Sequence, residues 1–153
     1  MRRSQRGGPC GAEHVPIEVE GNSLKDRELI ALATEARERA YTPYSQYKVG
    51  AALLSASGAV YTGCNVENAA YGLTICAEQV AVVKAVCAGE RDLMMIAVVS
   101  GNGGTPCGAC RQILNEFGPN VRVLVGDASG DYQAYALPDL LPDSFGPMQL
   151  RSG

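Results

Sequence analysis

The chain has 153 residues, of which 46% are hydrophobic and 19% are charged, and its formal net charge at pH 7 is −3. A chain of this length and composition can bury one hydrophobic core, so a single domain is expected. Lysine and arginine are scattered without a basic stripe, which argues against nucleic acid as a partner, and no apolar run is long enough to span a membrane.

Residues 1–22 are rich in glycine and charge and show no hydrophobic periodicity. We therefore expect a flexible N-terminal extension, followed by one domain over residues 23–153. The early arginines are not followed by an apolar segment, so the start does not match a secretory signal. This pattern predicts a cytoplasmic protein with reduced thiols, and it disfavours a disulfide framework among the six cysteines.

Predicted helices and strands alternate along the domain. The first helix is expected to begin with Ser23 at its N-cap and to be ended by Pro43. Further helices are predicted at residues 75–88 and 107–117, with a short helical segment at 137–139 and an irregular tail. Strands are predicted at 49–54, 59–62, 93–99, 121–125 and 132–136. This alternation predicts an α/β fold, a three-layer α/β/α sandwich on a mixed five-stranded sheet.

Three cysteines have the spacing of a metal site. Cys107 and Cys110 lie three residues apart at the start of a predicted helix, so their sulfurs fall about 60° apart on one face. Cys76, at the start of another helix, offers a third thiolate. Three protein ligands leave the fourth position of a tetrahedral zinc open, which is typical of a catalytic site. Glu78, close to the first ligand, is the natural proton carrier.

Other interpretations of these cysteines exist. A Pro-Cys-x-x-Cys motif can be a redox dithiol or half of a structural zinc site. A structural site needs a fourth ligand, for which Cys64 and Cys87 are the candidates. Cys87 lies about 16 Å along the predicted helix from Cys76 and is out of reach, whereas Cys64 remains open. The only histidine, His14, lies in the extension and is expected to be solvated.

Six separated motifs surround these residues: PYSQY at 43–47, VGAALL at 49–54, GCNVENAAY at 63–71, CAE at 76–78, PCGACRQ at 106–112 and LLPDSFG at 140–146. Together they resemble the cytidine deaminase family, in its three-cysteine, homotetrameric type. The resemblance covers about residues 24–150. It implies the same sandwich fold. The six motifs matched together are far more specific than any one of them.

The resemblance implies a chemistry for the cysteines. One zinc ion per subunit would be held by Cys76, Cys107 and Cys110. Hydroxide on the zinc would attack C4 of the cytosine ring while Glu78 carries protons to N3 and to the departing amine. Cytidine, and with it 2′-deoxycytidine, would become uridine or 2′-deoxyuridine with release of ammonia, which is a pyrimidine salvage reaction.

Substrate contacts follow from the same resemblance, position by position. Asn65 and Glu67 match the pair that hydrogen-bonds the ribose hydroxyls. Tyr47 stands where the family usually has a phenylalanine that packs on the pyrimidine, so its hydroxyl needs a polar partner. The backbone of Ala77 is expected to meet the hydrogen-bonding edge of the base.

Three more positions complete the expected site. Tyr71 and Phe145 match aromatic residues that reach the site from neighbouring subunits, which implies a homotetramer with shared active sites, although read alone they are ordinary core aromatics. Gln79 stands where many three-cysteine members have an arginine that moderates the thiolate charge. With no charge there, the site is expected to depend more on the two helix N-termini.

Two competing functions remain at this point. The first is a deaminase of another aminopyrimidine: a nucleotide, a blasticidin-type nucleoside or a base in nucleic acid. Asn65 together with Glu67 favours a free nucleoside, because a carboxylate at the ribose end repels a phosphate. The second, from another class, is a non-catalytic binding module stabilised by zinc, in which Glu78 would have no chemical role.

Overall fold

The computed structural model describes residues 22–151, so all but the last residue of the predicted N-terminal extension lies outside the described range. Five strands form one sheet: β1 (Gly50–Ser55), β2 (Val60–Cys64), β3 (Leu93–Val99), β4 (Arg122–Gly126) and β5 (Tyr132–Ala136). Their order is β2-β1-β3-β4-β5. Only the β3–β4 pair is parallel, and the other three pairs are antiparallel. The mixed five-stranded sheet is therefore confirmed.

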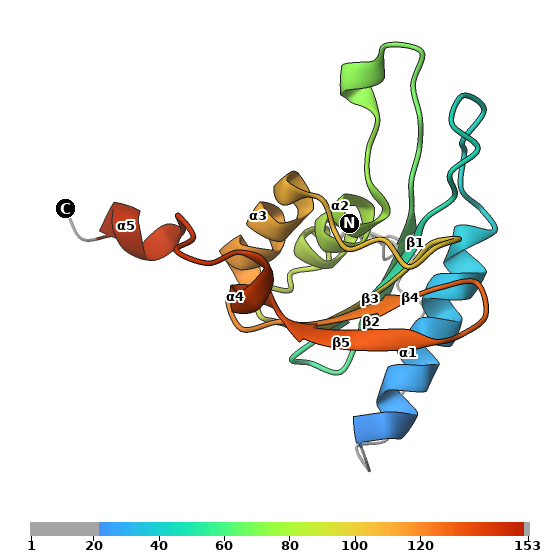
Figure 1. Cartoon of the computed structure of the whole chain (residues 1–153). Helices are drawn as coiled ribbons and strands as arrows, with labels where there is room; N and C mark the ends of the chain where they lie inside the picture. Colours follow the sequence, from blue (N-terminus) through green and yellow to red (C-terminus); the bar gives the residue numbers. More distant parts are fainter. Residues whose placement is uncertain (1–21, 152–153) are drawn as a thin grey trace, which may run out of the picture.

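Helices cover both faces of this sheet (Figure 1). They are α1 (Asn22–Arg37), the 3₁₀ turn η1 (Tyr71–Leu73), α2 (Ala77–Cys87), α3 (Gly108–Phe117), α4 (Leu137–Leu140) and α5 (Pro147–Arg151). One buried cluster joins α1 to the sheet, and another joins α2 and α3 to the opposite face. The predicted three-layer sandwich is confirmed.

The alternation of side chains along the central strands explains these two clusters. In β1, Ala51 and Leu53 belong to the cluster beneath α2 and α3, whereas Ala52 and Leu54 belong to the one beneath α1. Successive side chains of a strand point to opposite faces, so a wholly apolar strand serves both layers. In β3 the same holds for residues 96–99, which are buried, whereas Met94 near the start of the strand is 53% exposed.

Three predicted boundaries are wrong. The first helix begins at Asn22, so Ser23 lies inside it and is not its N-cap. The same helix ends at Arg37 and not at Pro43. After a tightened last turn the chain leaves the helix and pairs with the segment that follows β2, where Tyr41 N–H donates to Asn65 O over 3.1 Å. The tail is not wholly irregular, because α5 begins at Pro147. Proline suits the first position of a helix, where its missing N–H is not needed.

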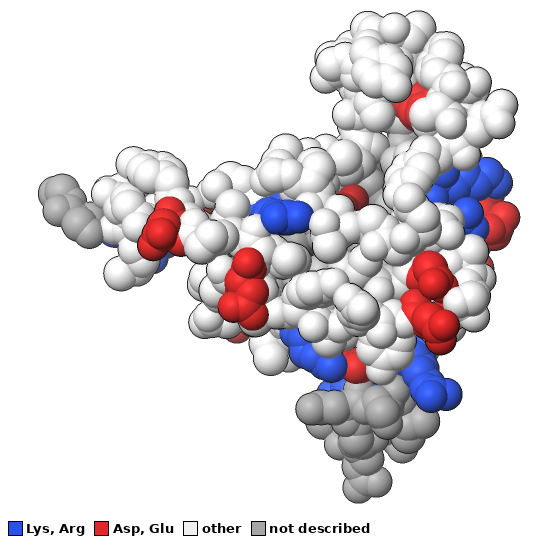
Figure 2. Space-filling model, viewed as in Figure 1, with Lys and Arg blue, Asp and Glu red and all other residues white. Residues whose placement is uncertain are grey.

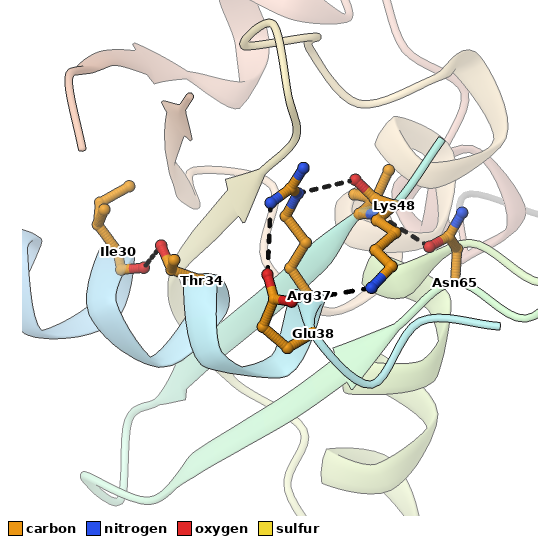
Figure 3. Close-up of polar contacts among 7 residues, drawn as sticks. Ile30, Thr34, Arg37, Glu38, Lys48 and Asn65 are labelled. Atoms are coloured by element: carbon orange, nitrogen blue, oxygen red, sulfur yellow. Dashed lines mark hydrogen bonds and ion pairs between the residues drawn. The ribbon is translucent and has the colours of Figure 1, made fainter. Parts of the chain in front are cut away.

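Polar contacts hold both ends of α1. Near its start, Asp26 is buried and forms a two-pronged ion pair with Arg122 of β4, with Oδ2 and Nη2 2.7 Å apart. At its end, Arg37 Nε donates to Lys48 O over 3.1 Å, and Glu38 lies 3.7 Å from Lys48 Nζ (Figure 3). The helix therefore fixes the residues that lead into β1.

The start of α2 lies directly against β2. A Cβ atom on Gly63 would come within 2.4 Å of Ala77 O, so only glycine lets the strand and the helix approach this closely. This contact places the residues at the N-terminus of α2 at one end of the sheet. Within residues 22–151, no helix combines the length and the apolar character needed to cross a bilayer.

Candidate active site

Three cysteine sulfurs meet where α2 and α3 begin. Cys76 is the N-cap residue of α2, Cys107 is the N-cap residue of α3, and Cys110 lies in the first turn of α3. Their Sγ atoms all lie within 4.8 Å of one another, and those of Cys107 and Cys110 are 3.5 Å apart. Tetrahedral zinc with Zn–S bonds of about 2.3 Å needs sulfurs about 3.8 Å apart. The cluster therefore fits a zinc ion.

The protonation of these thiols also suits a cation. The hydrogen bond from Cys110 is the main cause that lowers the pKa of Cys76 to about 7. The pKa of Cys110 is raised, chiefly because its thiol proton is held by Cys76 and because it is buried. Sulfurs this close cannot all ionise without a positive charge between them, and a metal ion supplies that charge.

The cluster contains three ligands and no fourth among the described residues. Cys64, at the end of β2, and Cys87, at the end of α2, are both free thiols outside it. Cys10 and His14 lie outside the described range. A third sulfur beside the Cys107–Cys110 pair favours a metal over a simple redox dithiol, and three ligands match an open catalytic geometry.

Both ligand-bearing helices direct their N-termini at the sulfurs. The first intrahelical bonds run from Val80 N–H to Cys76 O and from Arg111 N–H to Cys107 O, at 3.1 and 3.0 Å. The remaining free N–H groups of each first turn give a helix N-terminus about half a positive charge. Two such ends offset part of the negative charge of three thiolates.

Glu78 lies in the first turn of α2 beside this cluster and is only 4% exposed. Burial raises the pKa of its carboxyl group above the ordinary value. A carboxyl group in such surroundings holds a proton more readily than one in water.

A cavity of about 210 Å³ opens beside the sulfurs. Six residues predicted for the site line it: Tyr47, Asn65, Cys76, Ala77, Glu78 and Cys107. Cys110 is fully buried and does not line the cavity. The remaining lining residues are Val49, Thr74, Ile75, Val98, Ser100, Gly104 and Thr105. The structure thus brings two sulfurs, a buried carboxyl group and an aromatic ring to one small pocket.

The family described as the cytidine and deoxycytidylate deaminase zinc-binding region matches residues 23–126. The chain belongs to this family. A cytidine deaminase from Halalkalibacterium halodurans is 49% identical over 124 residues, covering 78% of this chain and 94% of the relative. The crystal structure of cytidine deaminase from Burkholderia pseudomallei is 50% identical, with a TM-score of 0.74, covering 77% of this chain and 97% of that one.

Asn65 holds the loop between α1 and β1 in place. Its Oδ1 accepts from Val49 N–H over 2.8 Å (Figure 3). Its Nδ2 donates to Tyr47 O, also over 2.8 Å. Asn65 therefore fixes the backbone of the pocket wall while it lines the cavity.

Glu67 is 7% exposed and does not line the cavity of the single chain. Its carboxylate accepts from the N–H groups of Tyr44 and Ser45 at 2.9 and 3.2 Å, and from the Ser45 hydroxyl. The Ser45 hydroxyl is the main cause that lowers the pKa of Glu67. This residue therefore stays ionised and ties the same loop to the strand end.

The other predicted site residues lie apart from the cavity. Tyr71 belongs to η1, which lies at the tip of a projecting arm (Figure 1), and is 70% exposed; Phe145 is 59% exposed. Gln79 uses its Oε1 to accept from Cys76 N–H over 3.3 Å, as in a capping box. The Gln79 side chain thus contacts the backbone of the predicted ligand Cys76.

Arg111 is a site residue that the sequence analysis missed. It donates to Pro106 O and Leu140 O, each over 2.7 Å, and to Thr105 Oγ1 over 3.0 Å. These bonds hold the segment that carries Cys107 and fasten it to α4. Its position directly after Cys110 was the one available indication, because the three acceptors come together only in the fold.

Replacing Arg111 with methionine should weaken metal retention. The loss of three hydrogen bonds frees the Cys107 segment, and outer-shell changes of this kind typically cost about 10- to 100-fold in metal affinity. Zinc release to a chelator, followed by a colorimetric zinc indicator, measures this. Arg91→Met is the matched control, because within residues 22–151 Arg91 bonds only Val86 O and Glu90 O, at the far end of α2. Equal release from both variants would contradict the expected role.

Proposed function

We propose that this chain catalyses the hydrolytic deamination of cytidine and 2′-deoxycytidine to uridine and 2′-deoxyuridine, with release of ammonia, in pyrimidine salvage. The observation that carries the proposal is the meeting of three cysteine sulfurs with the buried carboxyl group of Glu78 at one pocket. The relatives at 46–49% identity that bear the name cytidine deaminase support the substrate.

Cys76, Cys107 and Cys110 would hold one zinc ion in each subunit. A zinc ion held there would supply a water molecule of lowered pKa for the reaction. Glu78, in its buried position, takes a proton from the attacking water and delivers it to N3 of the cytosine ring. It then takes a second proton from the hydroxyl group added at C4 and delivers it to the amine, so that ammonia leaves as the C4 carbonyl forms. The burial of Glu78 keeps bulk water from competing for these protons.

The base and the sugar meet different residues. The ring of Tyr47 packs on the pyrimidine, and the backbone of Ala77 meets its hydrogen-bonding edge. Asn65 and Glu67 bind the ribose hydroxyls. The Glu67 carboxylate already accepts three hydrogen bonds, and since a carboxylate has about four acceptor sites, a ribose hydroxyl can take the one that remains.

The assembly we propose is a homotetramer with active sites shared between subunits. Large apolar side chains are exposed on two projecting segments, the arm that bears η1 and the C-terminal segment (Figure 1): Tyr71 at 70%, Leu73 at 66%, Phe145 at 59% and Leu150 at 75%. The arm carries almost no charge on the face seen in Figure 2. Exposed apolar segments of this kind mark association surfaces. In the tetramer, Tyr71 and Phe145 complete the pocket of a neighbouring copy.

The proposed location is the cytoplasm. Cysteines bind zinc only in their reduced, thiolate form, and the cytoplasm keeps cysteines reduced.

Glu78→Gln should abolish ammonia release while zinc stays bound. The amide keeps the shape of the side chain but cannot carry the proton, and general acid–base catalysis contributes about 10²- to 10⁴-fold. Ammonia release from cytidine and zinc content are measured on the same sample. Glu116→Gln, at an exposed position of α3, should retain full activity. An active Glu78→Gln enzyme would favour the non-catalytic binding module.

The substrate class is tested with a nucleoside panel. Cytidine and 2′-deoxycytidine should be deaminated with much higher kcat/KM than CMP, blasticidin S or cytosine in single-stranded DNA. Faster turnover of CMP would show that the charge of Glu67 does not exclude a phosphate.

Light scattering should give about four times the 16.1 kDa chain mass. Tyr71→Asp places a charge on the arm and should lower both the mass and the activity. A fully active monomer would contradict the shared-site arrangement.

A further inference from the structure

A hydrogen bond joins two loops that flank the cavity. Tyr47 Oη donates to Asn102 Oδ1 over 2.7 Å, across 55 residues of sequence. Tyr47 belongs to the loop between α1 and β1, and Asn102 belongs to the loop between β3 and α3. The second loop continues to Cys107, so the bond connects the aromatic wall of the pocket with the segment that carries a zinc ligand.

Asn102 acts from behind the pocket wall. Its Oδ1 also accepts from Ser100 Oγ at 3.3 Å, and Ser100 Oγ in turn accepts from Gly104 N–H at 2.9 Å. Ser100 is 1% exposed, so this small network has one buried member. Tyr47, Ser100 and Gly104 line the cavity, whereas Asn102 does not. The amide therefore holds three lining residues in place without facing the substrate.

The backbone around this bond leaves room for the hydroxyl group. A Cβ atom on Gly104 would lie 2.8 Å from Tyr47 Oη, closer than side chains tolerate. Glycine at this position thus lets the loop close onto the tyrosine.

Tyr47 is held at its other end as well. Its carbonyl oxygen accepts from Asn65 Nδ2 over 2.8 Å, and its N–H donates to Ser45 Oγ over 3.0 Å. With the hydroxyl bound to Asn102, the ring is fixed both at its backbone and at its tip. A ring fixed in this way loses little freedom when a ligand packs against it, which favours binding.

We propose that Asn102 is a positioning residue for the base pocket, and that the Tyr47–Asn102 hydrogen bond latches residues 100–104 against the ring. The latch sets the width of the pocket for a pyrimidine base. Its kinetic consequence rests on the proposed deaminase function, but its structural consequence does not. Because Tyr47 is 43% exposed, water competes for the bond, and its loss should change KM by about 2- to 10-fold.

The test compares the zinc-loaded full chain with Tyr47→Phe, Asn102→Leu and the double variant, using cytidine kinetics. Each single variant should raise KM by about 2- to 10-fold with kcat within about twofold, and the double variant should be no worse than either single one. Asn102→Asp keeps the acceptor oxygen and should have the KM of the parent. Tyr44→Phe, whose hydroxyl makes no hydrogen bond within residues 22–151, is the matched control and should change nothing.

Hydrogen exchange gives a second measurement, independent of activity. Peptides covering residues 100–104 should exchange faster in Tyr47→Phe and Asn102→Leu than in the parent, and at the parent rate in Asn102→Asp. Additive KM effects in the double variant, an unchanged KM in Asn102→Leu, or exchange that does not change would each overturn the latch. If the parent chain deaminates no cytidine, the proposed function is wrong. The hydrogen-exchange rates then test by themselves whether the Tyr47–Asn102 bond holds residues 100–104.

Discussion

The site depends on three sulfurs that meet at one point. Three thiolates this close repel one another unless a cation and the helix dipoles offset their negative charge. Two helices, α2 and α3, begin at that point and pack on the same face of the sheet. Close contact of α2 with Gly63 and the hydrogen bonds of Arg111 fix where the two helices start. The packing of the two helix N-termini on the sheet therefore determines where the metal site lies.

Two isolated β-bridges connect the pocket residues with the start of α2. Val66 pairs with Tyr41 on one side and Ile75 on the other. These three residues lead to Asn65 and Glu67, to the loop that carries Tyr47, and to Cys76. The residues proposed for the base and the sugar, together with the metal ligand Cys76, are thereby held side by side, although they come from three separate parts of the chain.

The sequence predicted the sheet and both ligand-bearing helices because these features follow from local patterns: apolar strands between turn residues, and cysteines spaced by one helical turn. It did not predict the end of α1, since pairing of Tyr41 with Asn65 decides that boundary. The second task of Asn65 and Glu67, holding a loop, was missed for the same reason. Leu140, which accepts from Arg111, and Tyr47, which donates to Asn102, are distant in sequence from these partners and become their neighbours only after folding.

The central claim is a zinc ion held by three sulfurs with its fourth position open. X-ray absorption at the zinc edge of the purified protein tests this most directly. We predict three sulfur neighbours at about 2.3 Å and one oxygen or nitrogen neighbour at about 2.0 Å, with the sulfur number falling to two in Cys76→Ala. Four sulfur neighbours, or a folded protein that binds no zinc, would contradict the account.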